Sequence, residues 1–295
     1  MTCADTSSSA AFAAKHSPIW YRTRRMLHRS FINVFLLTAL AATIIPIYWM
    51  IATSLKTTAQ MVVSPPLVVF SPTIENYLAL AGRSRWLLRN LINSVSITAL
   101  TSVLTLFFGS MAGFSFSRYR FPGHRFLSFT ILWTRTLPPI VAIVPLFLWM
   151  SDMGLVDSHL GLSLIYTALN LPFAVWMLKN FFDGVPIQLE EAAMIDGCSR
   201  IGAYRRVTIP LAAPGMAATA IFVGVLAWNE FMFALIFTNV RAKTLPVVVM
   251  ESIVEDKLYW MDMATIGTII MLPMFLFAVI IYRHLVKGLS FGAMK

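Results

Sequence analysis

Two ionisable side chains, Arg135 and Glu230, lie within or at the end of long apolar stretches. A charge deep in a membrane is costly, and such residues usually face the interior of a helix bundle or a water-filled cavity. Both are therefore candidates for a path that a polar solute could follow. The alternative is an ion pair between Arg135 and Glu230 that only holds helices together, and the sequence leaves both interpretations open.

Motifs of common catalytic and nucleotide-binding sites are absent from the sequence. It contains no His-Glu-x-x-His, Cys-x-x-Cys or Gly-x-x-x-x-Gly-Lys-Ser/Thr pattern, and its five histidines are scattered. The two cysteines, Cys3 and Cys198, fit a reducing compartment rather than a disulfide framework or a zinc site. We expect no catalytic residue, no bound metal or other cofactor, and no ATP bound by this chain in the usual way.

The composition predicts an all-α integral membrane protein. Hydrophobic residues make up 58% of the 295 and charged residues only 12%, whereas soluble domains carry about 25% charged residues. A span needs about 20 mostly apolar residues, and backbone groups in lipid must pair within their own segment, so each span should be a helix. Six transmembrane helices are predicted, at about 31–54, 91–116, 126–150, 159–181, 208–236 and 263–283.

Basic residues predict the orientation of these helices. Most of the 23 lysines and arginines lie in the tail 1–29, in the loops after the second and fourth spans, and near the C-terminus. Because positive residues in short loops favour the cytoplasmic side, both termini are predicted to be cytoplasmic, flanking a multi-pass domain at 30–287. The net charge of +10 then reflects this orientation and attraction to anionic membrane lipid, and no nucleic-acid binding is expected.

The N-terminal residues 1–18 are of low complexity and are predicted to form no packed structure. A secretory leader cleaved near Ala41-Ala42 is the alternative. It is disfavoured because the first apolar stretch begins only at Phe31 and is long enough to span the membrane.

A polar segment at 183–210, here the 183–210 loop, separates the fourth and fifth predicted spans. Pro186 suits the first turn of a helix, where its missing N–H would be unpaired in any case. Glu190 and Glu191 then lie early in that helix, where the helix dipole favours negative charge. The pattern predicts a short helix too polar to enter lipid.

A second short helix is predicted after Gly197, which can take the left-handed conformation that ends the first one. Ser199 can cap the second helix, and Pro210 is expected to end it. The result is a cytoplasmic helix-turn-helix that needs a protein surface to lie on. A surface-lying amphipathic loop without a partner is the plainer alternative, and a DNA-reading helix-turn-helix is excluded by the adjacent membrane spans.

The pattern Glu190-Glu191-Ala192-Ala193, then Asp196-Gly197 and finally Ile209-Pro210, closely resembles the "EAA loop" of ABC importer permeases. Segments 137–147, 227–231 and 288–295 resemble carbohydrate-importer permeases of the maltose-transporter type, and in particular the six-span partner of the permease pair. The likeness runs from about residue 20 to the end. The ending departs slightly from the usual pattern, at Ser290, Met294 and a missing final glycine.

This resemblance implies that the 183–210 loop docks on a separate ATPase subunit, which binds ATP and Mg in place of this chain. It also implies a second homologous permease subunit, an ATPase dimer, an external solute-binding protein and location in the bacterial cytoplasmic (inner) membrane. The segment 288–295 is carried over as a second ATPase contact. The implied ATPase-coupling residues are Glu190, Glu191, Ala192, Ala193, Asp196, Gly197, Pro210, Gly288 and Lys295.

For a carbohydrate or polyol importer, the candidate substrate path includes aromatic and amide side chains as well as the two charged residues. Aromatic faces stack on sugar rings and amides bond to hydroxyl groups, although tryptophan near a span end often only anchors at the interface. The candidates are Arg135, Asn170, Trp228, Asn229 and Glu230, with Trp133 as a further aromatic residue. An ion-gradient-driven secondary transporter would also use buried charges, but it has no need of the 183–210 loop. The sequence does not show whether a sugar, a polyol or a glycerol phosphodiester is carried.

Two outer loops are long enough to contact an external partner. The connection between the first two spans carries Pro65-Pro66 and aromatic residues, and 239–262 carries acidic residues on a predicted short helix. Ordinary solvated loops are the alternative. With the permease resemblance, contact with a solute-binding protein is favoured for both.

Overall fold

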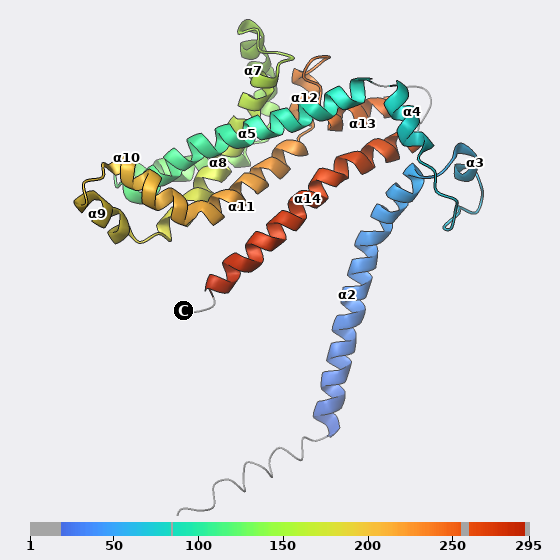
Figure 1. The fold of residues 1–295 in the computed structure, drawn as a ribbon, viewed down its shortest axis with the longest axis horizontal. Coiled ribbons are helices and arrows are strands. Elements are labelled where there is room, and N and C mark those ends of the chain that lie inside the picture. The colour runs from blue at the N-terminus through green and yellow to red at the C-terminus, as the bar shows by residue number, and fades with distance from the viewer. Residues whose placement is uncertain (1–18, 84, 255–259, 293–295) are drawn as a thin grey trace, which may run out of the picture. The chain divides into compact units, whose positions relative to one another are not determined.

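The computed structural model describes residues 19–83, 85–254 and 260–292, and every regular element in these ranges is a helix (Figure 1). The chain divides into two compact units, residues 1–53 and 54–295. The first unit contributes helix α2 (Ile19–Ser54), in which 28–54 is apolar enough to span a membrane. Helix α2 begins inside the predicted tail 1–29, whereas the low-complexity residues 1–18 lie outside the described part.

Five helical stretches in the described residues are long and apolar enough to cross a membrane, at 28–54, 86–118, 159–183, 200–228 and 260–279. A bent pair of helices at 124–136 and 140–152 makes a sixth if it is counted as one span. The predicted class, an all-helical membrane protein, is confirmed at this level. The helical stretches at 86–118 and 159–183 lie where the second and fourth spans were expected, at 91–116 and 159–181.

The prediction of one continuous third span at 126–150 is wrong. Helix α6 (His124–Trp133) and a short 3-10 helix, η1 (Thr134–Thr136), precede helix α7 (Ile140–Asp152), and the bend between the two halves is 97°. Leu137 takes an extended backbone with ψ 132°, as expected for a residue before a proline. Because Pro138 and Pro139 offer no N–H groups to the preceding turn, the helix ends there.

The predicted fifth span, 208–236, is also divided. Helix α11 (Ile209–Trp228) ends at Asn229, and a separate short helix, α12 (Met232–Phe237), follows. At the other end of α11, Pro210 does not stop a helix as predicted. The chain stays helical from α10 (Arg200–Ala203) through the π-helix η2 (Tyr204–Thr208) into α11. The wider π turn places Pro210 in the first turn of α11, where its missing N–H is tolerated.

The core of the second unit is built on close contact between helix α5 (Arg85–Arg118) and helix α8 (His159–Asp183), with α11 packed against both (Figure 1). A Cβ added at Gly113 of α5 would lie 3.1 Å from the backbone nitrogen of Lys179 and 3.2 Å from the Leu178 Cβ. One at Gly215 of α11 would overlap the Phe181 ring. Small residues at these positions let the helix backbones approach closely, as is common in membranes.

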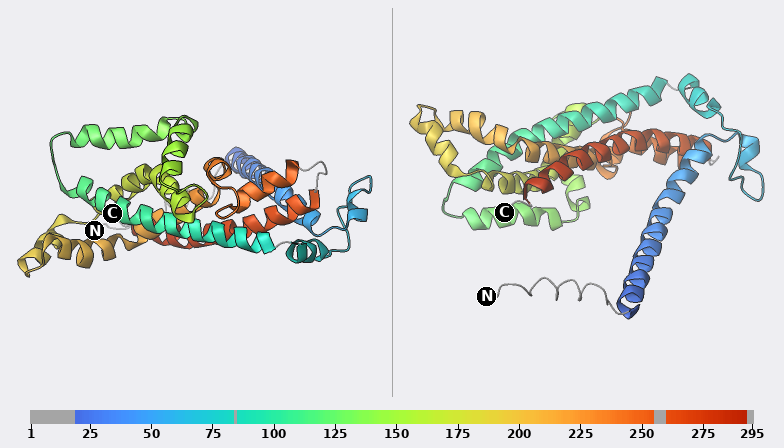
Figure 2. Two further views of the ribbon diagram at one scale, coloured as in Figure 1. Left: turned by 90° about the horizontal axis from the view of Figure 1, so that it is seen from above. Right: turned by 60° about the horizontal axis from the view of Figure 1, so that its bottom comes forward.

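The last long helix, α14 (Trp260–Gly292), packs against α11 and against helix α13 (Leu245–Val254). It continues through the end of the predicted sixth span at 283 and into the segment 288–295. Helix α9 (Ile187–Ile195) and α10 lie at one end of this unit, whereas α12, α13 and helix α4 (Glu75–Arg83) lie at the other, and a short helix, α3 (Thr58–Met61), precedes α4 (Figures 1 and 2).

Candidate functional site

Helix α9 ends at a turn around Gly197 that is closed by two backbone hydrogen bonds. The Gly197 N–H donates to the Met194 carbonyl (3.1 Å) and the Cys198 N–H donates to the Ala193 carbonyl (3.0 Å). Gly197 has a φ of +90°, so the predicted left-handed helix end is confirmed. This pattern is a Schellman motif, which satisfies carbonyl groups that a helix end leaves free. The chain therefore turns sharply here and starts a second helix.

The second helix begins as the sequence predicts, because the Ser199 Oγ accepts a hydrogen bond from the Gly202 N–H (3.1 Å). The Ile209 N–H then donates to the Tyr204 carbonyl, five residues back, within the π-helix. The predicted helix-turn-helix is therefore present in α9 and α10. It differs from the prediction in that the second helix runs directly into the fifth span.

Glu190 points into the protein and fastens the 183–210 loop to the end of α5. Its Oε1 lies 2.7 Å from Arg118 Nη2 and 2.8 Å from Arg118 Nε, and it accepts a hydrogen bond from the Thr208 Oγ1 (2.7 Å). Arg118 also donates to the Val185 carbonyl (2.8 Å). The Arg118 and Glu190 side chains are only 9% and 7% exposed. One carboxylate thus joins three segments: α5, α9 and η2.

Most of the remaining predicted coupling residues of the 183–210 loop are exposed. Glu191, Ala192 and Asp196 are exposed, Ala193 is half-buried, and Pro210 is exposed. Two large apolar side chains flank the Gly197 turn, with Ile195 86% and Ile201 66% exposed. The structure therefore separates the adjacent acids, with Glu190 used inside the chain and Glu191 available to a partner.

A small hollow of about 230 Å³ lies beside this helix pair. Glu191, Met194 and Arg200 contribute to its wall, together with Tyr119 from beyond the end of α5. The Arg200 guanidinium lies over the Tyr119 ring, 5.9 Å from its centroid. An acid, a base and apolar side chains are thus presented together at one surface.

Arg118, Thr208 and Tyr119 were not singled out from the sequence as site residues. Their contacts with this helix pair depend on tertiary packing, which sequence patterns do not show.

The ion pair suggested between Arg135 and Glu230 does not form. Arg135 is exposed on η1 and its guanidinium lies 5.2 Å from the centroid of the Phe173 ring. The Glu230 carboxylate instead accepts hydrogen bonds from the backbone N–H groups of Phe233 (3.0 Å) and Ala234 (3.3 Å). It therefore caps the start of α12, where negative charge is favourable.

The other substrate-path candidates do not gather into one site. Asn170 is buried and donates to the Tyr166 carbonyl of its own helix (2.8 Å). Trp228 is 3% exposed and its Nε1 donates to the Ile270 carbonyl of α14 (3.2 Å). Asn229 is exposed and lines a hollow of about 410 Å³ with residues of α13 and α14. Of these candidates, Asn229 thus has the most accessible position, whereas Trp228 and Asn170 pack helices.

At the opposite end of this unit, Asp157 holds the loop that leads into α13. Asp157 has a φ of 56°, and its carboxylate accepts hydrogen bonds of 3.0 to 3.1 Å from four successive backbone N–H groups, at 239–242. Partial burial raises the pKa of this carboxyl group, but the four N–H donors outweigh it and lower the pKa to about 2. Asp157 was not among the residues singled out from the sequence.

Asn93 of α5 holds the same loop from the other side. Its Nδ2 donates to the carbonyls of Arg241 and Lys243 (2.9 Å each), and its Oδ1 lies 2.8 Å from His159 Nε2. The loop is therefore fixed to both α5 and α8.

Among the described residues, no group of three or more His, Cys, Asp or Glu side chains could hold a metal ion. Of the C-terminal candidates, Gly288 lies in α14 and Lys295 lies outside the described residues.

Residues 105–291 match the family described as "Binding-protein-dependent transport system inner membrane component". The chain belongs to this family. It is thus the transmembrane permease component of an ABC transporter, the ATPase is a separate subunit, and the protein is a multi-pass inner-membrane protein. The matched region includes the whole 183–210 loop, and the predicted resemblance to ABC importer permeases is confirmed.

Curated relatives match over most of the chain. The trehalose/maltose transport system permease protein of Thermococcus litoralis is 34% identical over 85% of this chain and 91% of its own length. The sulfoquinovosyl glycerol transport system permease protein of Agrobacterium fabrum is 35% identical over 85% and 88%. The trehalose transport system permease protein of Mycobacterium tuberculosis is 34% identical over 85% and 92%. The resemblance therefore extends to permeases of carbohydrate uptake.

A solved structure supports the fold. A chain in the crystal structure of a bacterial ABC transporter that imports the acidic polysaccharide alginate superimposes with a TM-score of 0.75, covering 91% of this chain and 98% of that chain. The two sequences are 20% identical. At this level of identity the match supports the helical architecture alone.

Proposed function

We propose that this protein carries a carbohydrate, or a closely related polyhydroxylated solute, across the cytoplasmic membrane. The observation that supports this most is the match, over 85% of the chain, to permeases named for trehalose/maltose, trehalose and sulfoquinovosyl glycerol transport. Asn229 is exposed beside a hollow of about 410 Å³; its Nδ2 donates to the Val225 carbonyl (2.8 Å), and its Oδ1 is the group that would accept a hydrogen bond from a substrate hydroxyl. Arg135 and Glu230 remain path candidates only because each lies next to a break in a membrane helix.

The 183–210 loop is proposed as the element that docks on the ATPase. Within the loop, the Glu190–Thr208 contact joins α9 to η2, and the Glu190–Arg118 contact attaches the loop firmly to α5. Its outer surface presents an acidic group, Glu191, beside exposed Ile195 and Ile201. A surface with apolar centres and a charge at the edge suits a protein partner. Ala192, Ala193, Asp196 and Gly197 shape this surface, and Gly288 with Lys295 is proposed as a second contact.

We place α6 and α7 together as one broken span, which gives six spans with both termini in the cytoplasm. In this orientation the 183–210 loop is cytoplasmic, whereas α12, α13 and the loop held by Asp157 face outward. The proposed partners are a second homologous permease, an ATPase dimer on the inner side and a solute-binding protein on the outer side. A transporter of this family is binding-protein-dependent, and a fixed outer loop is a suitable surface for that protein.

The proposed mechanism follows from this arrangement. ATP binding closes the ATPase dimer, and the docked α9–α10 pair moves with it. Because η2 and α11 are continuous with α10, this motion passes directly into a membrane helix. The helices then change from inward-facing to outward-facing, and the binding protein delivers substrate into a cavity shared by the two permeases.

Uptake by the purified complex in proteoliposomes tests the proposal. With binding protein present, ATP inside the vesicles should drive accumulation of a neutral sugar without any ion gradient. Trehalose, maltose and a glycoside of glycerol are suitable first substrates. If this chain alone accumulates substrate from a proton gradient without ATP, the alternative of a secondary transporter is correct.

A further inference from the structure

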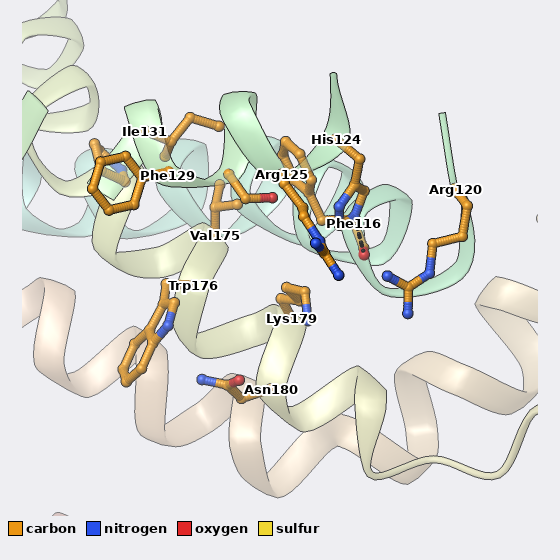
Figure 3. Close-up of a pocket in the computed structure, with 12 residues that line it drawn as sticks. Phe116, Arg120, His124, Arg125, Phe129, Ile131, Val175, Trp176, Lys179 and Asn180 are labelled. Atoms are coloured by element: carbon orange, nitrogen blue, oxygen red, sulfur yellow. Dashed lines mark hydrogen bonds between the residues drawn. The ribbon is translucent and has the colours of Figure 1, made fainter. Parts of the chain in front are cut away.

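A hollow of about 350 Å³ lies between α6 and α8 (Figure 3). Its lining combines two kinds of side chain that meet at a membrane surface, namely cations and large apolar groups. The cations are Arg120, Arg125 and Lys179, and the apolar groups include Phe129, Val175 and Trp176.

The cationic part of this hollow is only partly neutralised. Arg120 and Arg125 are exposed, and neither has a carboxylate within ion-pair distance among the described residues. Lys179 contributes a third charge, which it shares with Asp183 on the same helix. Figure 3 shows Arg125 reaching from α6 toward Lys179 on α8. No acidic side chain lines the hollow, so the site favours an anion.

The rest of the hollow is lined mostly by apolar side chains, with Ser128 and Asn180 among them. Phe129 is 65% and Trp176 46% exposed, and Val175 and Ile131 also contribute to the wall. The cations lie at the end next to the last turn of α5, and the aromatic residues extend from there along α6 and α8. A ligand that fits both parts has an anionic head and an apolar tail, with the head at the end of the helices.

We propose that this hollow binds an anionic glycerophospholipid of the cytoplasmic leaflet. Arg120, Arg125 and Lys179 contact its phosphate, since guanidinium groups match phosphate oxygens in geometry and charge. An acyl chain lies against Phe129 and Trp176. Basic pockets between membrane helices on the cytoplasmic side are suited to such head groups. The inference rests on the orientation proposed above, which places this end of α8 in the cytoplasm.

The position of the lipid gives it a structural role. It joins α6, which has few contacts with the rest of the unit, to α8 at the turn where Lys179 pairs with Asp183. Asp183 also accepts a hydrogen bond from the Ser117 hydroxyl (2.6 Å), next to the Arg118 that binds Glu190. The head group therefore lies beside the contacts that fix the 183–210 loop.

Native mass spectrometry of the purified importer complex, titrated with dioleoyl-phosphatidylglycerol, tests this site. One tightly retained phosphatidylglycerol is expected, and phosphatidylcholine with the same chains should not be retained. Arg120→Gln/Arg125→Gln should weaken retention by roughly tenfold or more. The control Arg25→Gln/Arg29→Gln removes the same charge from α2 and should keep the bound lipid. Equal retention in wild type and Arg120→Gln/Arg125→Gln would overturn the proposal.

A photo-crosslinking amino acid at Phe129 separates lipid from protein occupants. Cross-linking to lipid supports the site, whereas cross-linking mainly to the second permease or to the ATPase shows that a protein fills the hollow and overturns it. ATP-driven uptake is measured on the same preparations. Loss of the lipid from Arg120→Gln/Arg125→Gln with ATP-driven uptake retained would support the lipid site and leave the proposed function standing, whereas absence of ATP-driven uptake in wild type would reject the proposed function independently.

Discussion

At the scale of single residues, the adjacent acids Glu190 and Glu191 have different surroundings. Glu190 is enclosed by Arg118 and Thr208, whereas Glu191 is exposed at the surface. Their order along the sequence does not reveal this difference, because the helix dipole favours negative charge at both positions. Only the packing of α9 against α5 and η2 decides which carboxylate turns inward.

Glu190→Gln should destabilise the protein, because it leaves the Arg118 guanidinium buried without its counter-charge. Removing one partner of a buried ion pair typically costs about 3–5 kcal/mol, and thermal unfolding of the purified protein measures the loss. Glu191→Gln should leave the unfolding temperature unchanged and reduce copurification of the ATPase. Equal unfolding temperatures for wild type and Glu190→Gln would show that this contact does not fix the loop.

Asp157 should make stability depend on pH in the acid range. Its folded pKa of about 2 lies below the ordinary value of 3.8, so the charged group stabilises the folded state above about pH 4. That contribution is lost as the pH falls from about 4 to 2. The difference in unfolding temperature between wild type and Asp157→Asn should therefore be largest at neutral pH and shrink on acidification. A difference that stays constant from pH 6 to pH 3 would contradict this account.

At the scale of helices, the sequence predicts most of the described elements but misplaces the breaks. Hydropathy locates the spans because each must bury its backbone groups within itself. It overlooks the Pro138-Pro139 break, since both prolines lie in an uninterrupted apolar stretch. Rules for proline would have identified that break. The same rules wrongly predicted that Pro210 ends a helix, because a π turn accommodates it.

The separation of α11 from α12 is harder to predict. No proline marks it, and the local signal is only Glu230 placed three residues before Phe233, whose N–H it caps. The long-range hydrogen bonds are equally hard to predict from the sequence, because they join residues far apart in it. An example is Asn93, which donates to the carbonyl groups of residues 241 and 243. Sequence patterns thus predict the helices and the 183–210 loop. The hydrogen bonds that hold the loops against the helices are seen only in the folded structure.

Gly197→Leu should abolish transport while leaving the protein inserted in the membrane. A side chain at this left-handed position costs about 1–2 kcal/mol of backbone strain. A Cβ there meets nothing within 4 Å, so the effect comes from the changed path between α9 and α10 rather than from a clash. Uptake assays on proteoliposomes measure it.

Two matched variants define the cause of that effect. Gly197→Asn should retain more uptake than Gly197→Leu, because asparagine tolerates the left-handed region. Gln188→Ala, on the exposed side of α9, should be mild. Similar uptake in Gly197→Leu and Gln188→Ala would show that the turn geometry is unimportant for coupling.

At the scale of the whole molecule, the two ends of residues 54–295 are proposed to bind different partners. One end carries the α9–α10 pair with its exposed Ile195 and Glu191. The other carries α13 and the loop fixed by Asp157 and Asn93. Between them, α11 continues directly from η2. An importer needs such a connection between an ATPase on one side and a solute-binding protein on the other.

Site-specific photo-crosslinking in the assembled importer tests this assignment most directly. A photo-crosslinking amino acid at Ile195 should cross-link to the ATPase subunit and not to the solute-binding protein. The same group at Val240, which is 61% exposed at the opposite end, should cross-link to the solute-binding protein and not to the ATPase. Cross-linking of Ile195 to the solute-binding protein, or of Val240 to the ATPase, would contradict the orientation and the docking role of the 183–210 loop.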